Sequence, residues 1–148
     1  MLPLRGDHVD AWLAWPDIVA APTLETCRAL LSEQERTTHD RFHFAHDRAT
    51  YAVAHALVRR ALSRYCEVAP AEWRFVTDAH GRPHVAPGSP PIAFNLSHTR
   101  GLSACIVGGA SAIGVDVDEM RDLDALFEVA DHSFASAEVS DLAPPNHA

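Results

Sequence analysis

The sequence of 148 residues contains no lysine, so arginine supplies all twelve of its basic side chains. It also lacks an apolar run of membrane-spanning length, and its N-terminus lacks the basic-then-apolar order of a signal peptide. These absences predict a cytoplasmic protein without a membrane partner. The arginines matter wherever the chain must hold a phosphate, because a planar guanidinium can donate two parallel hydrogen bonds.

Cysteine is scarce as well. Cys27, Cys66 and Cys105 are odd in number and widely spaced, which argues against a disulfide framework or a zinc knuckle. We expect all three to be small buried hydrophobic residues. The ten histidines are scattered along the chain, and we expect most of them to be surface or capping residues.

Positive charge is nearly absent from the last part of the chain. Residues 1–110 hold eleven arginines and eleven acids, whereas residues 111–148 hold one arginine and nine acids. The net charge of −8 at pH 7 therefore comes almost entirely from the far end. Because an acidic segment repels nucleic acid and attracts cations, we expect no nucleic-acid partner.

Three helical segments are predicted in the first half of the chain. Thr23 is a candidate cap for a helix that runs through Leu31, and Ser32 followed by Glu35 is typical of a capping box at the start of another. The longest helix is predicted from Asp47 to about Tyr65, because apolar residues recur on one side of it. Its other side carries four arginines that we expect to form mostly a solvated face. They are Arg48, Arg59, Arg60 and Arg64.

Strands are predicted where apolar residues alternate or cluster between turns. Residues 8–15 and 73–77 fit this pattern, and a turn follows at 78–83. Residues 102–107 and 112–117, joined by two glycines, predict an antiparallel hairpin, and a helix is predicted at 121–129. The fold class is therefore α+β, with a long helix packed on a mostly antiparallel sheet.

Two polar clusters lie at the ends of short apolar runs, at residues 95–99 and 116–119. In the second cluster the valines alternate with Asp116 and Asp118, which would place both carboxylates on one face of a strand. Such a pair suits Mg²⁺, which takes a few carboxylates together with waters and substrate phosphates. The first cluster offers hydrogen-bond donors for a phosphate. Taken singly, the acidic pair could equally be solvated surface, and the first cluster could be strand-end capping.

Together the two clusters carry a resemblance to a family. Phe94-Asn95-Leu96-Ser97-His98-Thr99, followed by the Gly-Val-Asp-Val-acid run at 114–118, resembles the 4'-phosphopantetheinyl transferases of the surfactin-synthetase-activating type. Residues 41–59 also follow the family's pattern, and residues 134–142 resemble the opening of its second lobe. The resemblance divides the chain into an N-terminal lobe at 1–130 and the beginning of a truncated second lobe at 131–148. The sequence contains no Trp-x-x-Lys-Glu-Ala-type motif, from which the family takes a third metal-ligand Glu and a catalytic Lys.

The resemblance implies an enzyme that transfers the 4'-phosphopantetheine group of coenzyme A to a serine of an acyl or peptidyl carrier protein. Asp116 and Asp118 would be the catalytic acids that hold Mg²⁺. The family's second acid is usually Glu, so Glu119 is an alternative ligand, although strand geometry turns it to the other face and favours Asp118.

The resemblance also implies a set of coenzyme A contacts. Ser97 and His98 would contact the phosphates, and Arg82 would lie against the nucleotide end, because Gly81-Arg82-Pro83 resembles the family's Gly-Lys-Pro. Arg48 would grip the 3'-phosphate, unless Thr50 occupies the family's basic position.

Two other interpretations stay open. The chain could be a non-catalytic lobe that binds coenzyme A or a carrier protein, or a half-site completed by another chain, as single-lobe relatives do by forming trimers. In either case an exposed apolar lobe face would favour self-association.

Overall fold

The computed structural model describes residues 1–4, 8–109 and 113–119. The chain divides into two compact units, Met1–Asp118 and Glu119–Ala148, and only Glu119 of the second is described. The predicted helix at 121–129 and the second-lobe segment at 134–142 lie outside the described residues. The boundary between residues 130 and 131 stays a prediction.

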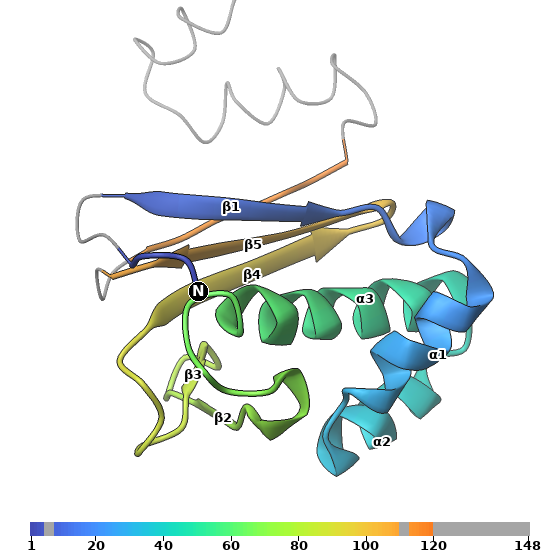
Figure 1. Cartoon of the computed structure of the whole chain (residues 1–148). Helices are drawn as coiled ribbons and strands as arrows, with labels where there is room; N and C mark the ends of the chain where they lie inside the picture. The colour runs from blue at the N-terminus through green and yellow to red at the C-terminus, as the bar shows by residue number, and fades with distance from the viewer. Residues whose placement is uncertain (5–7, 110–112, 120–148) are drawn as a thin grey trace, which may run out of the picture. The chain divides into compact units, whose positions relative to one another are not determined.

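A three-stranded antiparallel sheet forms one layer of the first unit (Figure 1). Its order is β1 (Val9–Ala14), β5 (Leu102–Gly108) and β4 (Ala93–Thr99). Strand β5 takes the central place because nearly all of its side chains are apolar or small, and all but the first are buried. The turn from β4 to β5 passes through Gly101, whose φ of 80° favours glycine.

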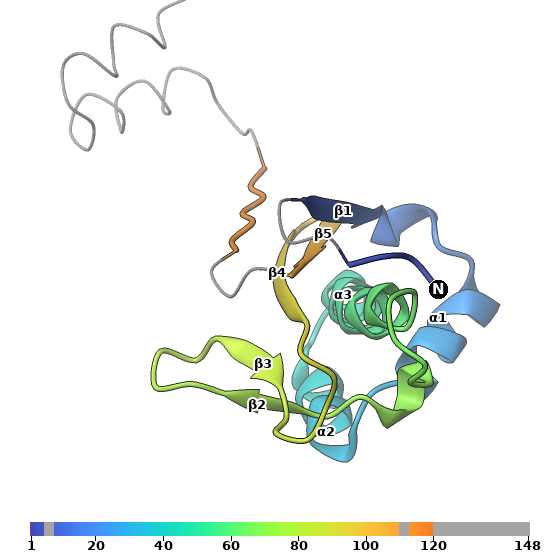
Figure 2. The ribbon, with the colours of Figure 1, turned by 60° about the vertical axis from the view of Figure 1, so that its left-hand side comes forward.

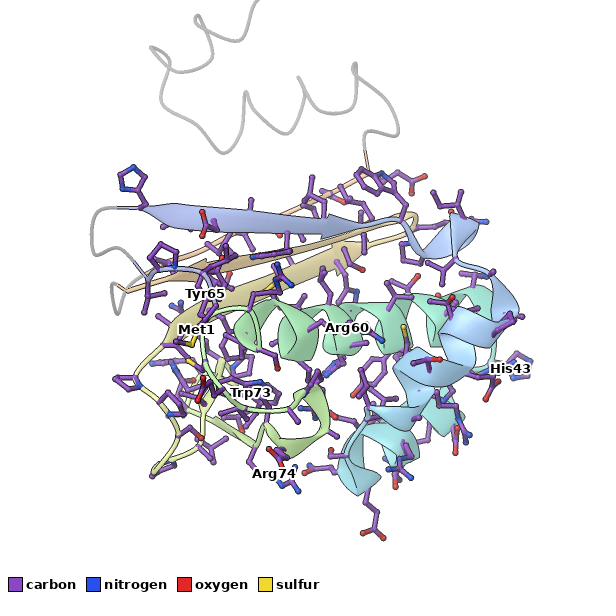
Figure 3. All side chains as sticks on the ribbon, viewed as in Figure 1. Met1, His43, Arg60, Tyr65, Trp73 and Arg74 are labelled. Atoms are coloured by element: carbon purple, nitrogen blue, oxygen red, sulfur yellow. The ribbon has the colours of Figure 1, made fainter. Side chains whose placement is uncertain are left out.

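The long helix α3 (Ala45–Leu62) packs on one face of this sheet, as the view along the helix in Figure 2 shows. Its residues Val58 and Leu62 share a core with Phe94 of β4 and Cys105 of β5. Trp73, labelled in Figure 3, is 1% exposed in the same core. The long helix and the α+β fold class are therefore confirmed, although the helix begins two residues earlier and ends three residues earlier than predicted.

The two shorter helices, α1 (Ala21–Ala29) and α2 (Glu33–Arg41), lie before α3 in the chain. The capping box of α2 is confirmed, because Ser32 Oγ accepts from the Glu35 amide at 3.2 Å and Glu35 Oε2 accepts from the Ser32 amide at 2.7 Å. The cap of α1 is Ala20 and not Thr23. The helix starts earlier because Pro22 fits its first turn, where a missing N–H leaves no hydrogen bond unmade.

A separate two-stranded hairpin consists of β2 (Phe75–Thr77) and β3 (Pro83–Val85). The predicted turn between them is confirmed, and Asp78 Oδ1 accepts from the amides of His80 and Arg82. Two short 3₁₀ helices, Pro16–Ile18 and Pro70–Glu72, complete the described elements.

The predicted hairpin of residues 102–107 with 112–117 is wrong. Strand β5 pairs with β1 on one edge and with β4 on the other, so it has no free edge for a third strand. Residues 113–119 form no strand in the structure. Local periodicity indicated a strand here, but long-range pairing with β1 occupies the edge that the hairpin needs.

The three cysteines are unpaired, as predicted. Cys27 and Cys105 are buried, whereas Cys66 is only partly so. No helix within the described ranges has the length and apolarity needed to cross a membrane.

Candidate functional site

The acidic segment at residues 113–118 is attached to the sheet by side chains of β4. Phe94 and Leu96 of β4 face α3, so Asn95 and Ser97 lie on the opposite face. Asn95 Oδ1 accepts from the Val115 amide at 2.8 Å, and Ser97 Oγ accepts from the Val117 amide at 3.1 Å. Side chains thus supply acceptors that a neighbouring strand's carbonyls would supply in a regular sheet.

Asp116 is oriented by the same arrangement. The Ser97 hydroxyl donates to its Oδ1 at 2.9 Å, and the Val117 amide donates to that same oxygen at 3.0 Å. Within the described residues no hydrogen bond engages Oδ2. The carboxylate is exposed, so one oxygen is held by the protein and the other is available to a ligand.

The burial of residues 115–118 alternates as the sequence predicts. Val115 and Val117 are half-buried, whereas Asp116 and Asp118 are exposed. The structure therefore brings both candidate metal ligands to the exposed side of one short segment, without a strand ladder. The choice between Asp118 and Glu119 stays open.

This donor set fits Mg²⁺ in part. Carboxylate oxygens are the ligands that a hard divalent cation prefers. The part of the chain that the structure describes holds no cluster of three or more His, Cys, Asp or Glu side chains that could bind a metal ion. A cation held by Asp116 and Asp118 would therefore keep most of its positions for water and for phosphate oxygens.

His98 is the next residue along β4 from Ser97, and its side chain lies on the other face of the strand. The structure therefore does not place the Ser97 and His98 side chains on the same face. Partial desolvation by the surrounding protein lowers the pKa of His98, and the charge of the nearby His55 on α3 adds a smaller effect in the same direction. At neutral pH His98 is thus favoured as an uncharged imidazole, which can still donate one hydrogen bond.

A groove of about 820 Å³ lies between α2, α3, β2 and β4, on the α3 side of the sheet. It is rich in aromatic rings and in groups that can hydrogen-bond, and Phe94 and Leu96 of β4 form part of its wall. Its other lining residues include Glu35, Tyr51, His55, Arg59 and Phe75. Grooves of this size and mixed character are typical of small-molecule sites.

The prediction that the arginines of α3 form a solvated face is wrong for Arg59, which lies in this groove. Its side chain is 2% exposed, Nη2 donates to Glu35 Oε2 at 2.5 Å, and Nη1 donates to the Trp73 carbonyl at 3.1 Å. The guanidinium also lies 4.8 Å from the centre of the Phe75 ring. Arg60, labelled in Figure 3, and Arg64 are exposed as predicted.

Glu35 connects this arginine to His55. Its Oε1 lies 2.9 Å from His55 Nδ1. Its Oε2 accepts hydrogen bonds from the Ser32 amide and from Arg59 Nη2. Burial acts to raise the pKa of Glu35, but the hydrogen bonds from His55 and Ser32 and the charge of Arg59 outweigh it and lower the pKa to about 2. The sequence predicted Glu35 only as a helix-capping residue.

We predict a loss of stability in acid that depends on Glu35. Its pKa is lower in the folded chain than in the unfolded chain, so its stabilisation is complete above about pH 4.5 and is lost as the pH falls toward 2. The free energy of unfolding, measured by urea denaturation across this range, should fall less steeply in Glu35→Gln than in the parent. The matched control Glu33→Gln removes an exposed acid of the same helix and should keep the parent's slope. Equal slopes for all three proteins would contradict the prediction.

The two remaining candidate residues make contacts within the protein. Arg48 Nη1 donates to the carbonyls of Phe42 and His43, at 2.7 and 3.1 Å, and so holds the turn before α3. Arg82 Nη2 donates to the carbonyl of Ile113. Their contacts with coenzyme A, like those of Ser97 and His98, stay predictions.

Comparison with known proteins gives matches to a family model, to curated relatives and to solved structures. The sequence model of a family described as "4'-phosphopantetheinyl transferase, N-terminal" matches residues 19–109. The 4'-phosphopantetheinyl transferase HetI of a Nostoc species is 28% identical over 139 residues, which are 93% of this chain and 58% of that protein. The 4'-phosphopantetheinyl transferase Sfp of Bacillus subtilis is 28% identical over 118 residues, which are 80% of this chain and 51% of that protein.

The chain thus spans about half the length of these curated relatives. Among solved structures, a holo-(acyl-carrier-protein) synthase from Bacillus anthracis, in complex with CoA (3',5'-ADP), matches with a TM-score of 0.53. The match covers 67% of this chain and 91% of that chain at 15% identity. At this identity the likeness concerns the fold.

Proposed function

Because the chain belongs to the 4'-phosphopantetheinyl transferase family, we propose that it serves the Mg²⁺-dependent transfer of 4'-phosphopantetheine from coenzyme A to a serine of an acyl or peptidyl carrier protein. The observation that carries this proposal is the hydrogen bonding of the Asp116 carboxylate. One of its oxygens is held by Ser97 and the Val117 amide, and the other faces solvent free of any hydrogen bond within the described residues. A carboxylate held in this way suits a cation that also binds substrate phosphates.

In this proposal Asp116 and Asp118 hold Mg²⁺ through carboxylate oxygens. The cation, when bound, neutralises charge on the pyrophosphate of coenzyme A. The main role of Ser97 is to orient Asp116, since its hydroxyl already donates a hydrogen bond to that carboxylate. Because the single hydroxyl proton of Ser97 is donated to Asp116, no donor is left for a phosphate oxygen. We therefore expect the Ser97 contribution to coenzyme A binding to pass mainly through Asp116.

The groove on the α3 side of β4 is the proposed place of the nucleotide end of coenzyme A. Its rings from Tyr51 and Phe75 offer stacking surfaces, and the Glu35 charge within it is already compensated by Arg59.

The reaction is a displacement at phosphorus. The serine hydroxyl oxygen of the carrier protein forms a new bond to the β-phosphorus of coenzyme A, and the bond from that phosphorus to the oxygen of 3',5'-ADP breaks. The serine hydroxyl proton is released to water, and 3',5'-ADP is the leaving group. The acids on residues 116 and 118 contribute by positioning and charge and form no covalent bond.

A second candidate function is that of a lobe which binds coenzyme A or a carrier protein without transferring the group, or of a half-site completed by another chain. Self-association through an exposed lobe face would accompany the latter.

Mass spectrometry of a carrier protein separates the candidates. We expect the phosphopantetheine mass increment to appear when the apo carrier protein is incubated with this protein, coenzyme A and Mg²⁺, and to be absent with excess EDTA. Calorimetry with coenzyme A, with and without EDTA, forms the second measurement. Binding that weakens with EDTA but no mass increment would favour the binding lobe, an increment confined to an oligomeric fraction would favour the shared site, and no binding in either condition would refute the proposal.

A further inference from the structure

The attachment of residues 113–118 to β4 has a defined register. The two acceptors on β4 are two residues apart, Asn95 and Ser97, and the two amides they bind are also two residues apart, Val115 and Val117. A shift of the segment by one residue would turn Asp116 toward the sheet and Val115 toward solvent, because side chains alternate. The match of these two spacings therefore decides which side chains face outward.

The two acceptors have different contacts. Ser97 both accepts from Val117 and donates to Asp116. Within the described residues the Asn95 side chain hydrogen-bonds only with the backbone amide of Val115. A change at Asn95 therefore tests the register of the segment without removing a hydrogen bond of the Asp116 carboxylate.

We propose that Asn95 is a positioning residue that sets the register of residues 113–118 and so directs Asp116 outward. The functional part of this inference rests on the proposed role of Asp116 in holding a divalent cation. Asn95 contributes through the Val115 amide, and it does not need to touch the cation or the substrate.

A neighbouring anchor limits the effect of losing Asn95 to this segment. Arg82 donates to the carbonyl of Ile113. The Ile113 side chain is itself buried, next to Gly108 at the end of β5. The segment therefore stays attached at Ile113 when the bond at Val115 is removed. We expect local release around Val115 and an intact fold elsewhere.

Amide hydrogen exchange of the full chain, followed by NMR, tests the register. In Asn95→Ala the Val115 amide should exchange at least about tenfold faster, since its acceptor is lost. In Asn95→Asp exchange should stay near that of the parent, because a carboxylate oxygen at the same place still accepts. The matched control Ser103→Ala, at a buried serine of β5 whose hydroxyl has no hydrogen-bond partner within the described residues, should leave Val115 unchanged.

Binding of Mn²⁺ in the presence of coenzyme A, followed by electron paramagnetic resonance, tests the consequence for Asp116. The half-saturating Mn²⁺ concentration should rise about tenfold in Asn95→Ala, as for loss of other groups that orient a metal ligand, and should not rise in Asn95→Asp. An unchanged exchange rate of the Val115 amide in Asn95→Ala would refute the proposal that Asn95 sets the register. Faster exchange with unchanged Mn²⁺ binding would overturn the positioning role. Absence of Mn²⁺ binding by the parent would refute the metal site of the proposed function, while the exchange data would still decide the register.

Discussion

Asp116→Asn is expected to lower the rate of phosphopantetheine transfer by about a thousandfold, comparable to the loss of other preorganised electrostatic groups. The substitution is nearly isosteric, and the Val117 amide still requires an acceptor where Asp116 Oδ1 lies. The new amide should therefore keep its oxygen there and place its NH₂ group at the position of Oδ2. An NH₂ group cannot coordinate a cation, so the oxygen that is available in the parent is lost.

The measurement is the initial rate of the mass increment on a carrier protein, made with this protein, coenzyme A and Mg²⁺. Thermal unfolding should show a nearly unchanged midpoint, because the Asp116 side chain is exposed. Glu25→Gln is the matched control, since it removes one negative charge from an exposed position on α1. A rate for Asp116→Asn within a few-fold of the control would remove Asp116 from the catalytic site.

Arg59→Met is expected to destabilise the fold by about 3–5 kcal/mol, the usual result of removing one partner from a buried ion pair. The guanidinium is 2% exposed and Glu35 is 14% exposed, so the remaining carboxylate would keep its charge in a poorly solvated place. The Trp73 carbonyl would also lose its donor, and Phe75 would lose the cation beside its ring.

Urea denaturation of the variant and of Arg60→Met provides the comparison. Arg60 is the next residue of α3 and is exposed, so its replacement should change the free energy of unfolding by well under 1 kcal/mol. Adding Glu35→Gln to Arg59→Met should recover part of the loss, because the buried negative charge that lost its arginine partner is then absent. A small effect of Arg59→Met, similar to that of Arg60→Met, would show that the ion pair contributes little net stability.

The difference between these two neighbouring arginines illustrates what sequence periodicity can predict. A helical pattern predicted the course of α3 and the side on which its apolar residues lie, because both depend on positions three and four residues apart. It could not predict that Arg59 is buried. That outcome depends on Glu35 of α2 and on Trp73 and Phe75, which come from two other segments of the chain.

The sequence by itself determined the family, through the order of Asn95-Leu96-Ser97-His98 and the acidic run from Asp116. It also determined the long helix α3 and the capping box of α2, because helical periodicity and this capping pattern are local. Only the tertiary structure decided what residues 113–118 contact. Their alternation suited a strand, but β1, from the other end of the described unit, occupies the edge of β5 that they would have used. They are held instead by Asn95 and Ser97, because backbone amides that cannot join a ladder still require acceptors.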